Sequence, residues 1–143
     1  MTDMLRQQQA TLTITPHGRG MVNITRELTT LLGGSSITKG IMHLFVQHTS
    51  CSLLVQENAD PEVQSDLERF LCRLIPDGDP LFKHTAEGPD DMPAHVRAAL
   101  TATSLSIPII DGRMALGTWQ GVYLYEHRQA ATRRRVVVHI CGV

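Results

Sequence analysis

The strongest constraint on the fold is the way that side chains divide by parity between residues 40 and 48. Met42, Leu44 and Val46 fall on one side of an extended chain, and His48 ends the same row. A second run, 51–58, divides in the same way and ends in Glu57 on its apolar side. These patterns predict two strands that each bury one face, with His48 and the partly desolvated Glu57 at the ends of the buried rows.

The rest of the chain alternates between helical and extended patterns. Apolar residues at helical spacing predict short helices over 24–32, 60–74 and 92–100, the second of which begins with an Asp60-Pro61 cap. Further strands are expected over 9–14, 104–110, 113–116, 118–127 and 135–141. We therefore predict a single α+β domain spanning 1–143, with a largely antiparallel sheet and about three short helices.

Length and charge narrow the functional classes. A chain of 143 residues can bury one ordinary core, and 13 basic against 14 acidic side chains provide no positive field for a nucleic acid. No apolar run reaches the roughly 20 residues of a membrane span, and the first residues do not have the pattern of a signal peptide. We expect a cytoplasmic protein that binds neither nucleic acid nor membrane.

Seven histidines in so short a chain suggest a metal site. His48, His84 and His95 each lie at the boundary of a predicted element, where a rigid support meets an open approach. Catalytic metal sites usually take three protein ligands, and imidazole suits zinc, nickel or iron. The alternative is that these are ordinary half-exposed histidines with hydrogen-bond partners.

Three carboxylates are candidates for moving a proton: Glu57, Asp91 and Glu126. Asp91 precedes His95 by one helical turn, so it either orients that imidazole or caps the helix. Glu126 shares the parity of apolar neighbours and would be semi-buried, unless it merely pairs with Arg128 or an arginine of the 133–135 run.

Two segments have the small and polar residues of an anion site. One follows His48, and the other surrounds the only tryptophan between two glycines. Together with the arginine run they would hold a phosphate or carboxylate, although the glycines also suit a bulge and the tryptophan also suits packing. The candidate residues are Thr49, Ser50, Thr118, Trp119, Gln120 and Arg135.

Three strings in the same order resemble the YjbQ family, also called the secondary thiamine-phosphate synthase family. They are HTSCSLLVQENADPEV from His48, HTAEGPDDMPAHV from His84, and GTWQGVYLYEHR from Gly117, closed by RRRVVV. The resemblance implies a small α+β domain that forms homotrimers and binds a divalent metal at His48, His84 and His95. Three imidazole ligands make zinc the first expectation, with nickel or iron as alternatives. It also assigns family positions to Glu57, Asp91, Glu126 and the Gly-Thr-Trp-Gln stretch.

The resemblance further implies a weak or auxiliary thiamine-phosphate synthase activity, which joins a pyrimidine pyrophosphate to a thiazole phosphate and releases pyrophosphate. The expected partner is a small phosphorylated metabolite. Two alternatives remain open at this point: a metal-dependent hydrolase or lyase acting on a small phosphorylated metabolite, and a metal- or metabolite-binding protein without turnover.

Overall fold

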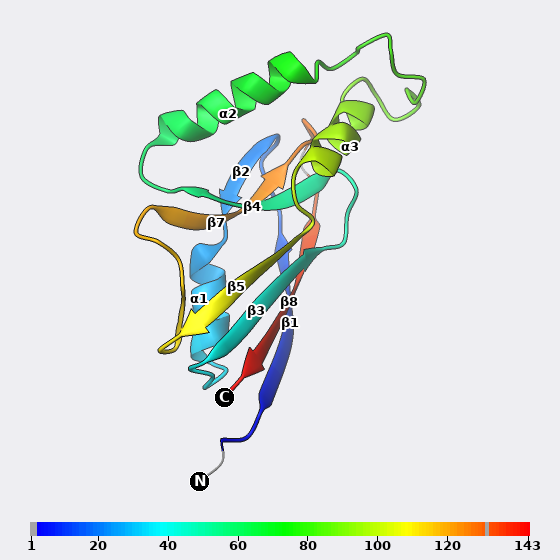
Figure 1. Cartoon of the computed structure of the whole chain (residues 1–143). Coiled ribbons are helices and arrows are strands. Elements are labelled where there is room, and N and C mark those ends of the chain that lie inside the picture. The colour runs from blue at the N-terminus through cyan, green and yellow to red at the C-terminus, as the bar shows by residue number, and fades with distance from the viewer. Residues whose placement is uncertain (1–2, 131) are drawn as a thin grey trace.

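The structure is a computed structural model that describes residues 3–130 and 132–143 (Figure 1). Every strand pair in the described part of the chain is antiparallel, which confirms the predicted α+β class. The elements are β1 (Arg6–Ile14), β2 (Gly20–Asn23), α1 (Thr25–Gly33), β3 (Gly40–Val46), β4 (Cys51–Glu57), α2 (Pro61–Leu74), α3 (Asp91–Leu100), β5 (Ser104–Ile110), β6 (Arg113–Met114), β7 (Gln120–Glu126) and β8 (Arg134–Gly142).

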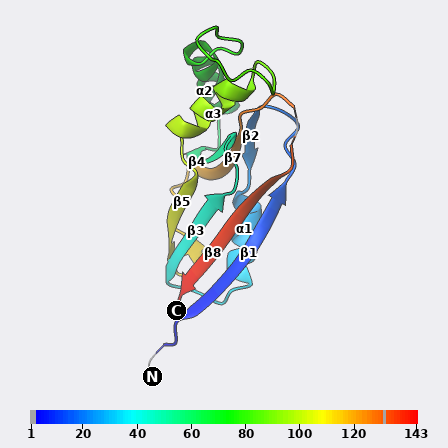
Figure 2. The same ribbon diagram turned by 90° about the vertical axis from the view of Figure 1, so that its right-hand side faces the viewer.

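The larger sheet has five strands in the order β1-β8-β3-β5-β6. Its central strands bury the apolar row that the parity of residues 40–48 predicted, because alternate side chains of β3 and β8 meet across the ladder. The matched core pairs are Met42 with Ile140, Leu44 with Val138, and Val46 with Val136. Figure 2 shows the opposite face of this sheet toward the viewer and α1 behind it.

The smaller sheet has three strands in the order β2-β7-β4, so β7 is paired on both edges. Val122 and Leu124 of β7 face the main core, where they join Leu28 and Leu32 of α1. Tyr125 points to the other face, where its hydroxyl donates to Glu68 of α2 at 2.6 Å. Strand β7 is therefore buried on both faces. The short β2 was not predicted, since its four residues are too few to show a periodic pattern.

Helix α2 lies at the end of the molecule away from the two termini (Figure 1). The Asp60 carboxylate accepts from the Glu62 amide at 2.9 Å, as the predicted cap requires. No residue of α2 is buried, and Phe70 and Leu74 of its apolar stripe are 51% and 57% exposed. None of the described helices combines the length and apolarity needed to cross a lipid bilayer.

Buried polar groups lie beneath α2 and α3, next to the end of β7. His127 is fully buried, its Nε2 lies 2.8 Å from the Ser52 hydroxyl, and its ring packs on Tyr125. Burial, assisted by the positive charge of Arg97, lowers the pKa of His127 to about 3. The imidazole is therefore neutral in the folded protein.

We predict that His127 makes the fold sensitive to acid. In the unfolded chain a histidine has a pKa of about 6.5, so the unfolded state binds this proton first as the pH falls. The free energy of unfolding should decrease between the unfolded-state pKa and about 3, by up to roughly 1.4 kcal/mol per pH unit. Urea unfolding at a series of pH values measures this slope.

His127→Gln keeps an amide near Ser52 and should flatten the slope, whereas His17→Gln changes an exposed histidine and should leave it unchanged. An equal slope in wild type and His127→Gln would show that another group is responsible.

Candidate functional site

Two of the three predicted histidines meet at the start of α3, and a carboxylate lies between them. His84 comes from the segment that joins α2 to α3, residues 75–90, while Asp91 and His95 lie one turn apart on α3. The Oδ2 atom of Asp91 is 2.7 Å from His84 Nε2 and 3.1 Å from His95 Nε2. The three ligand atoms all lie within 4.8 Å of one another. Each of the three residues offers one atom that could ligate a metal ion.

The position of His95 decides which of its nitrogens has a free lone pair. Its Nδ1 lies 2.9 Å from the carbonyl oxygen of Thr49, which can only accept a hydrogen bond. Nδ1 therefore bears the proton, and in the neutral ring Nε2 presents its lone pair toward Asp91. Two acceptors face each other at this point, so the pair requires either a second proton on His95 or a cation between the two groups.

Asp91 is almost completely buried yet remains ionised. Burial alone would raise the pKa of its carboxyl, but hydrogen bonds and charge from His84, His95 and Arg128 outweigh that effect, so the pKa lies below its usual value. Arg128 donates from Nη1 to Oδ1 at 2.7 Å, which leaves Oδ2 to the imidazoles. Of the two roles predicted for Asp91, the contact with His95 is present. The residue that precedes the helix is Asp90 instead.

His48 lies outside the group formed by His84, Asp91 and His95. Its Nε2 accepts from the main-chain amide of Arg135 at 2.9 Å, so that lone pair is already used within this chain. Partial burial and the charges of Arg134 and Arg135 lower the pKa of His48, against an opposing effect of Glu126. The three predicted histidines therefore do not form one group within the single chain. The third member of the group is Asp91.

Glu126 and Ser50 form a buried polar cluster with an arginine of the 133–135 run. Arg134 donates to Glu126 at 2.8 and 2.5 Å and to the Ser50 hydroxyl at 2.9 Å. Glu126 is completely buried, and it also accepts from the amides of His127 and Arg128. Glu126 is thus ion-paired with the arginine run 133–135, which was one of the two alternatives predicted for it. The partner is Arg134, while Arg135 is exposed and contributes its main-chain amide to His48.

The remaining predicted residues lie at the other end of β4 and β7. Antiparallel register places Glu57 opposite Gln120 and Cys51 opposite Glu126. Six residue steps of about 3.3 Å separate these ends by roughly 20 Å. Glu57 accepts from the Asp60 amide at 2.7 Å, and Trp119 is 63% exposed beside Thr118. Within one chain, Glu57, Thr118, Trp119 and Gln120 are therefore distant from His95 and Thr49.

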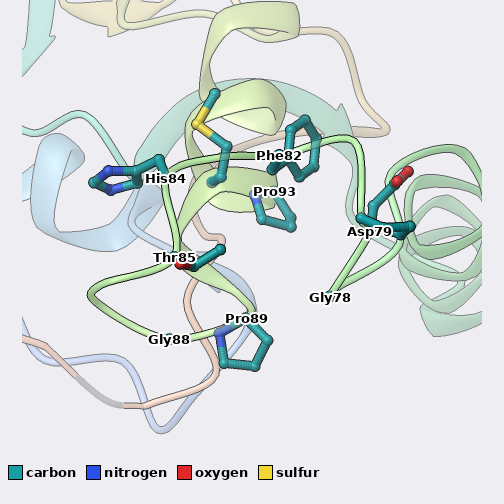
Figure 3. A pocket seen from close by; sticks show the side chains of 10 residues that line it. Gly78, Asp79, Phe82, His84, Thr85, Gly88, Pro89 and Pro93 are labelled. Carbon is teal, nitrogen blue, oxygen red and sulfur yellow. The ribbon is translucent and has the colours of Figure 1, made fainter.

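A pocket of about 300 Å³ adjoins the site. Its lining includes Phe82, Pro89, Met92 and Pro93, together with part of His84. Figure 3 shows the imidazole of His84 directed away from Phe82 and Asp79. The walls are residues between Gly78 and Pro89 of this segment, together with Met92 and Pro93 from the first turn of α3.

Sequence reasoning also missed the role of Arg128, which it considered only as a partner for Glu126. Arg128 instead contacts Asp90 and Asp91, 38 and 37 residues away along the chain. A contact between residues so far apart in the sequence leaves no local periodicity from which it could be predicted. The carbonyl of Thr49, which orients His95, left no sequence signal either, since every residue has a carbonyl.

The fold and this site define a class: small antiparallel α+β proteins with a His-Asp-His group at a helix start. A family model described as "UPF0047 protein YjbQ-like" matches residues 10–143, so the chain belongs to the YjbQ/UPF0047 family.

Relatives support this assignment. The chain is 47% identical over 137 residues to a UPF0047 protein of Synechocystis, covering 96% of this chain and 93% of the relative. It is 42% identical over 135 residues to the UPF0047 protein YjbQ of Escherichia coli O157:H7, covering 94% and 97%. A conserved hypothetical protein from Thermus thermophilus, 39% identical, superposes with a TM-score of 0.80 over 90% of this chain and 97% of that one. A YbjQ-like protein of unknown function from Sulfolobus solfataricus, 20% identical, shares the fold with a TM-score of 0.88 over 98% and 100%.

We predict that Arg134→Met lowers the free energy of unfolding by about 3–5 kcal/mol, because it leaves the Glu126 carboxylate buried without its partner. Chemical denaturation measures the loss. Arg135→Met removes a neighbouring exposed arginine and should change stability by only about 0.5 kcal/mol. The double variant Glu126→Gln/Arg134→Met buries no unpaired charge and should be more stable than Arg134→Met alone. Equal effects of the two single arginine changes would contradict this account.

Proposed function

We propose that this protein is a metal-dependent enzyme whose ligands are Nε2 of His84, Oδ2 of Asp91 and Nε2 of His95. The observation that supports the proposal most directly is the lone pair of His95 Nε2, which the Thr49 carbonyl turns toward an ionised carboxylate. Metal-bound histidines characteristically donate their other N–H to a carbonyl or carboxylate, as His95 does here.

The donor set suits a transition metal more than magnesium. Two imidazoles and one carboxylate match zinc or iron(II), with nickel also acceptable, whereas magnesium prefers oxygen ligands and bound water. Zinc is our first choice. When bound, such an ion would supply Lewis acidity toward a phosphoryl oxygen. His84 is 47% exposed at its side chain and His95 30%, so the group is open to a small molecule from solvent.

We propose a small phosphorylated metabolite as the substrate, in a thiamine-phosphate synthase-type transfer that releases pyrophosphate. The supporting features are the open site and the exposed Thr49 and Arg135 near it, which offer a hydroxyl and a positive charge to an anion.

We further propose that the chain acts as a homotrimer. The apolar stripe of α2 supports an assembly, because Phe70 and Leu74 expose more apolar surface than a free helix face favours. We predict a mass of three times 15.8 kDa by light scattering coupled to size exclusion. A monomer at micromolar concentration would contradict this proposal.

The metal proposal predicts that stripped protein binds one Zn²⁺ per chain in isothermal titration calorimetry. Loss of a residue that only orients a metal ligand can weaken binding by about 100-fold. His84→Ala, His95→Ala and Asp91→Asn each remove or weaken a ligand itself, so each should weaken Zn²⁺ binding by more than that. His48→Ala is the matched control from the predicted trio. It should retain binding, because His48 lies outside the ligand group in this chain.

Turnover is tested with the same variants. Wild-type protein loaded with metal is incubated with a pyrimidine pyrophosphate and a thiazole phosphate, and the release of pyrophosphate and thiamine phosphate is followed. We expect activity that chelation and His84→Ala abolish. Equal turnover in His84→Ala, or zinc binding that this variant leaves unchanged, would refute the proposed function.

A further inference from the structure

We propose that Arg128 is the positioning residue of the His84-Asp91-His95 group: it selects the orientation of the Asp91 carboxylate and holds the segment that supplies His84. The inference rests on the proposed function for the identity of the bound ion, but the positioning itself is a property of the chain. It goes beyond the ligand set, because Arg128 touches no imidazole and can act only through Asp91 and its neighbours.

The Arg128 guanidinium binds three groups between Glu87 and the first residue of α3. Nη1 donates to Oδ1 of Asp91 at 2.7 Å, and Nε donates to Oδ2 of Asp90 at 3.0 Å. Nη2 donates to the carbonyl oxygen of Glu87 at 2.9 Å. A planar guanidinium has its donors in a fixed fork, so satisfying all three fixes the relative positions of these groups. Lysine has one nitrogen and cannot span them.

The orientation of Asp91 is what this fork controls. A carboxylate rotates easily about its terminal torsion, and its two oxygens are chemically equivalent. With Oδ1 held by Arg128, Oδ2 is the oxygen that faces both imidazoles, at 2.7 Å from His84 and 3.1 Å from His95. The side chain of Asp91 is 2% exposed, so with Arg128 in place its Oδ1 is satisfied by the guanidinium and not by bulk solvent.

Arg128 is itself anchored to the sheet. Its main-chain amide donates to Oε2 of Glu126 at 3.2 Å, and Glu126 is held by the buried guanidinium of Arg134. Glu126 thus sets the path of the chain just after β7, and Arg128 transmits that position to α3. Glu126 is fully buried, and it is linked to the His84-Asp91-His95 group through Arg128.

The same turn also fastens the 75–90 segment at a second place. The amide of Gln129 donates to Asp90 at 2.9 Å, and its side chain donates to Asp77 at 2.6 Å. Arg19 adds a bidentate contact to Asp77 at 3.0 and 2.9 Å. Arg19 therefore provides a matched control: it pairs with an aspartate of the same segment and donates to the His127 carbonyl at 2.8 Å, but it makes no hydrogen bond to Asp91 or to an imidazole among the described residues.

The experiment measures Zn²⁺ affinity by calorimetry in wild type, Arg128→Ala, Arg128→Lys, Asp90→Asn and Arg19→Ala. Arg128→Ala should weaken binding by about 10–100-fold, the usual effect of losing a residue that orients a metal ligand. Arg128→Lys keeps the charge and should recover only part of the affinity. Asp90→Asn loosens the guanidinium without touching an imidazole and should weaken binding less than Arg128→Ala. Arg19→Ala should remain within about twofold of wild type.

A second measurement does not depend on metal. Long-range ¹⁵N–¹H NMR spectra of the stripped protein report the protonated nitrogen of each imidazole. Arg128→Ala should shift the ring signals of His84 and His95, and Arg19→Ala should leave them in place. Circular dichroism tests whether each variant is folded. If Arg128→Ala is unfolded, the same spectra are recorded on Arg128→Lys.

The outcomes separate the two proposals. If wild type binds no zinc but Arg128→Ala shifts both ring signals, the proposed metal function fails and the positioning role stands. If a folded Arg128→Ala or Arg128→Lys variant keeps wild-type zinc affinity and unchanged ring signals, the positioning role is overturned. It is overturned equally if Arg19→Ala weakens zinc binding as much as Arg128→Ala, because the effect would then be general loosening of the segment.

Discussion

Three carboxylates at one end of the molecule are wholly or partly buried. Each is held by the guanidinium of an arginine that lies outside its own helix or strand. The pairs are Glu126 with Arg134, Asp91 with Arg128, and Glu68 with Arg97. A buried charge that loses its partner is strongly destabilising, so these pairs must form together with the sheets around them. The first pair joins β7 to β8, the second joins the chain just after β7 to α3, and the third joins α3 to α2, so together they link the sheets to the helix that bears the candidate site.

The site combines a rigid half with a tethered half. Asp91 and His95 are one turn apart on α3, and the Thr49 carbonyl fixes the His95 ring from the turn between β3 and β4. His84 belongs to a segment without regular structure, whose position depends on contacts to the chain just after β7. The helix therefore fixes the positions of Asp91 and His95, and the 75–90 segment brings His84 beside them. Such a division is a common way of keeping a site both ordered and open.

Much of this could be predicted from short-range patterns. The parity of residues 40–48 identified the buried row of β3, Asp60-Pro61 identified the start of α2, and the parity of Glu126 correctly placed it inside. His84 and His95 were expected to meet, and they do. The grouping of His48 with them was not reproduced in the single chain, because β3 ends before His48 and the Arg135 amide takes its Nε2. Glu57 and Trp119 were grouped with the same site although the register of β4 and β7 sets them at the far end.

The amino-acid sequence by itself determined the α+β class, the faces that strands and helices bury, and the family, because these depend on periodicity and on motifs read within a few residues. Only the tertiary structure decided which polar groups share a site. Asp91, and not His48, is the neighbour of two imidazoles, and the guanidinium of Arg128 binds Asp91 while only its main-chain amide contacts Glu126. The physical reason is that the partner of a buried charge is chosen by distance and direction in space, and strand register, not sequence spacing, sets both.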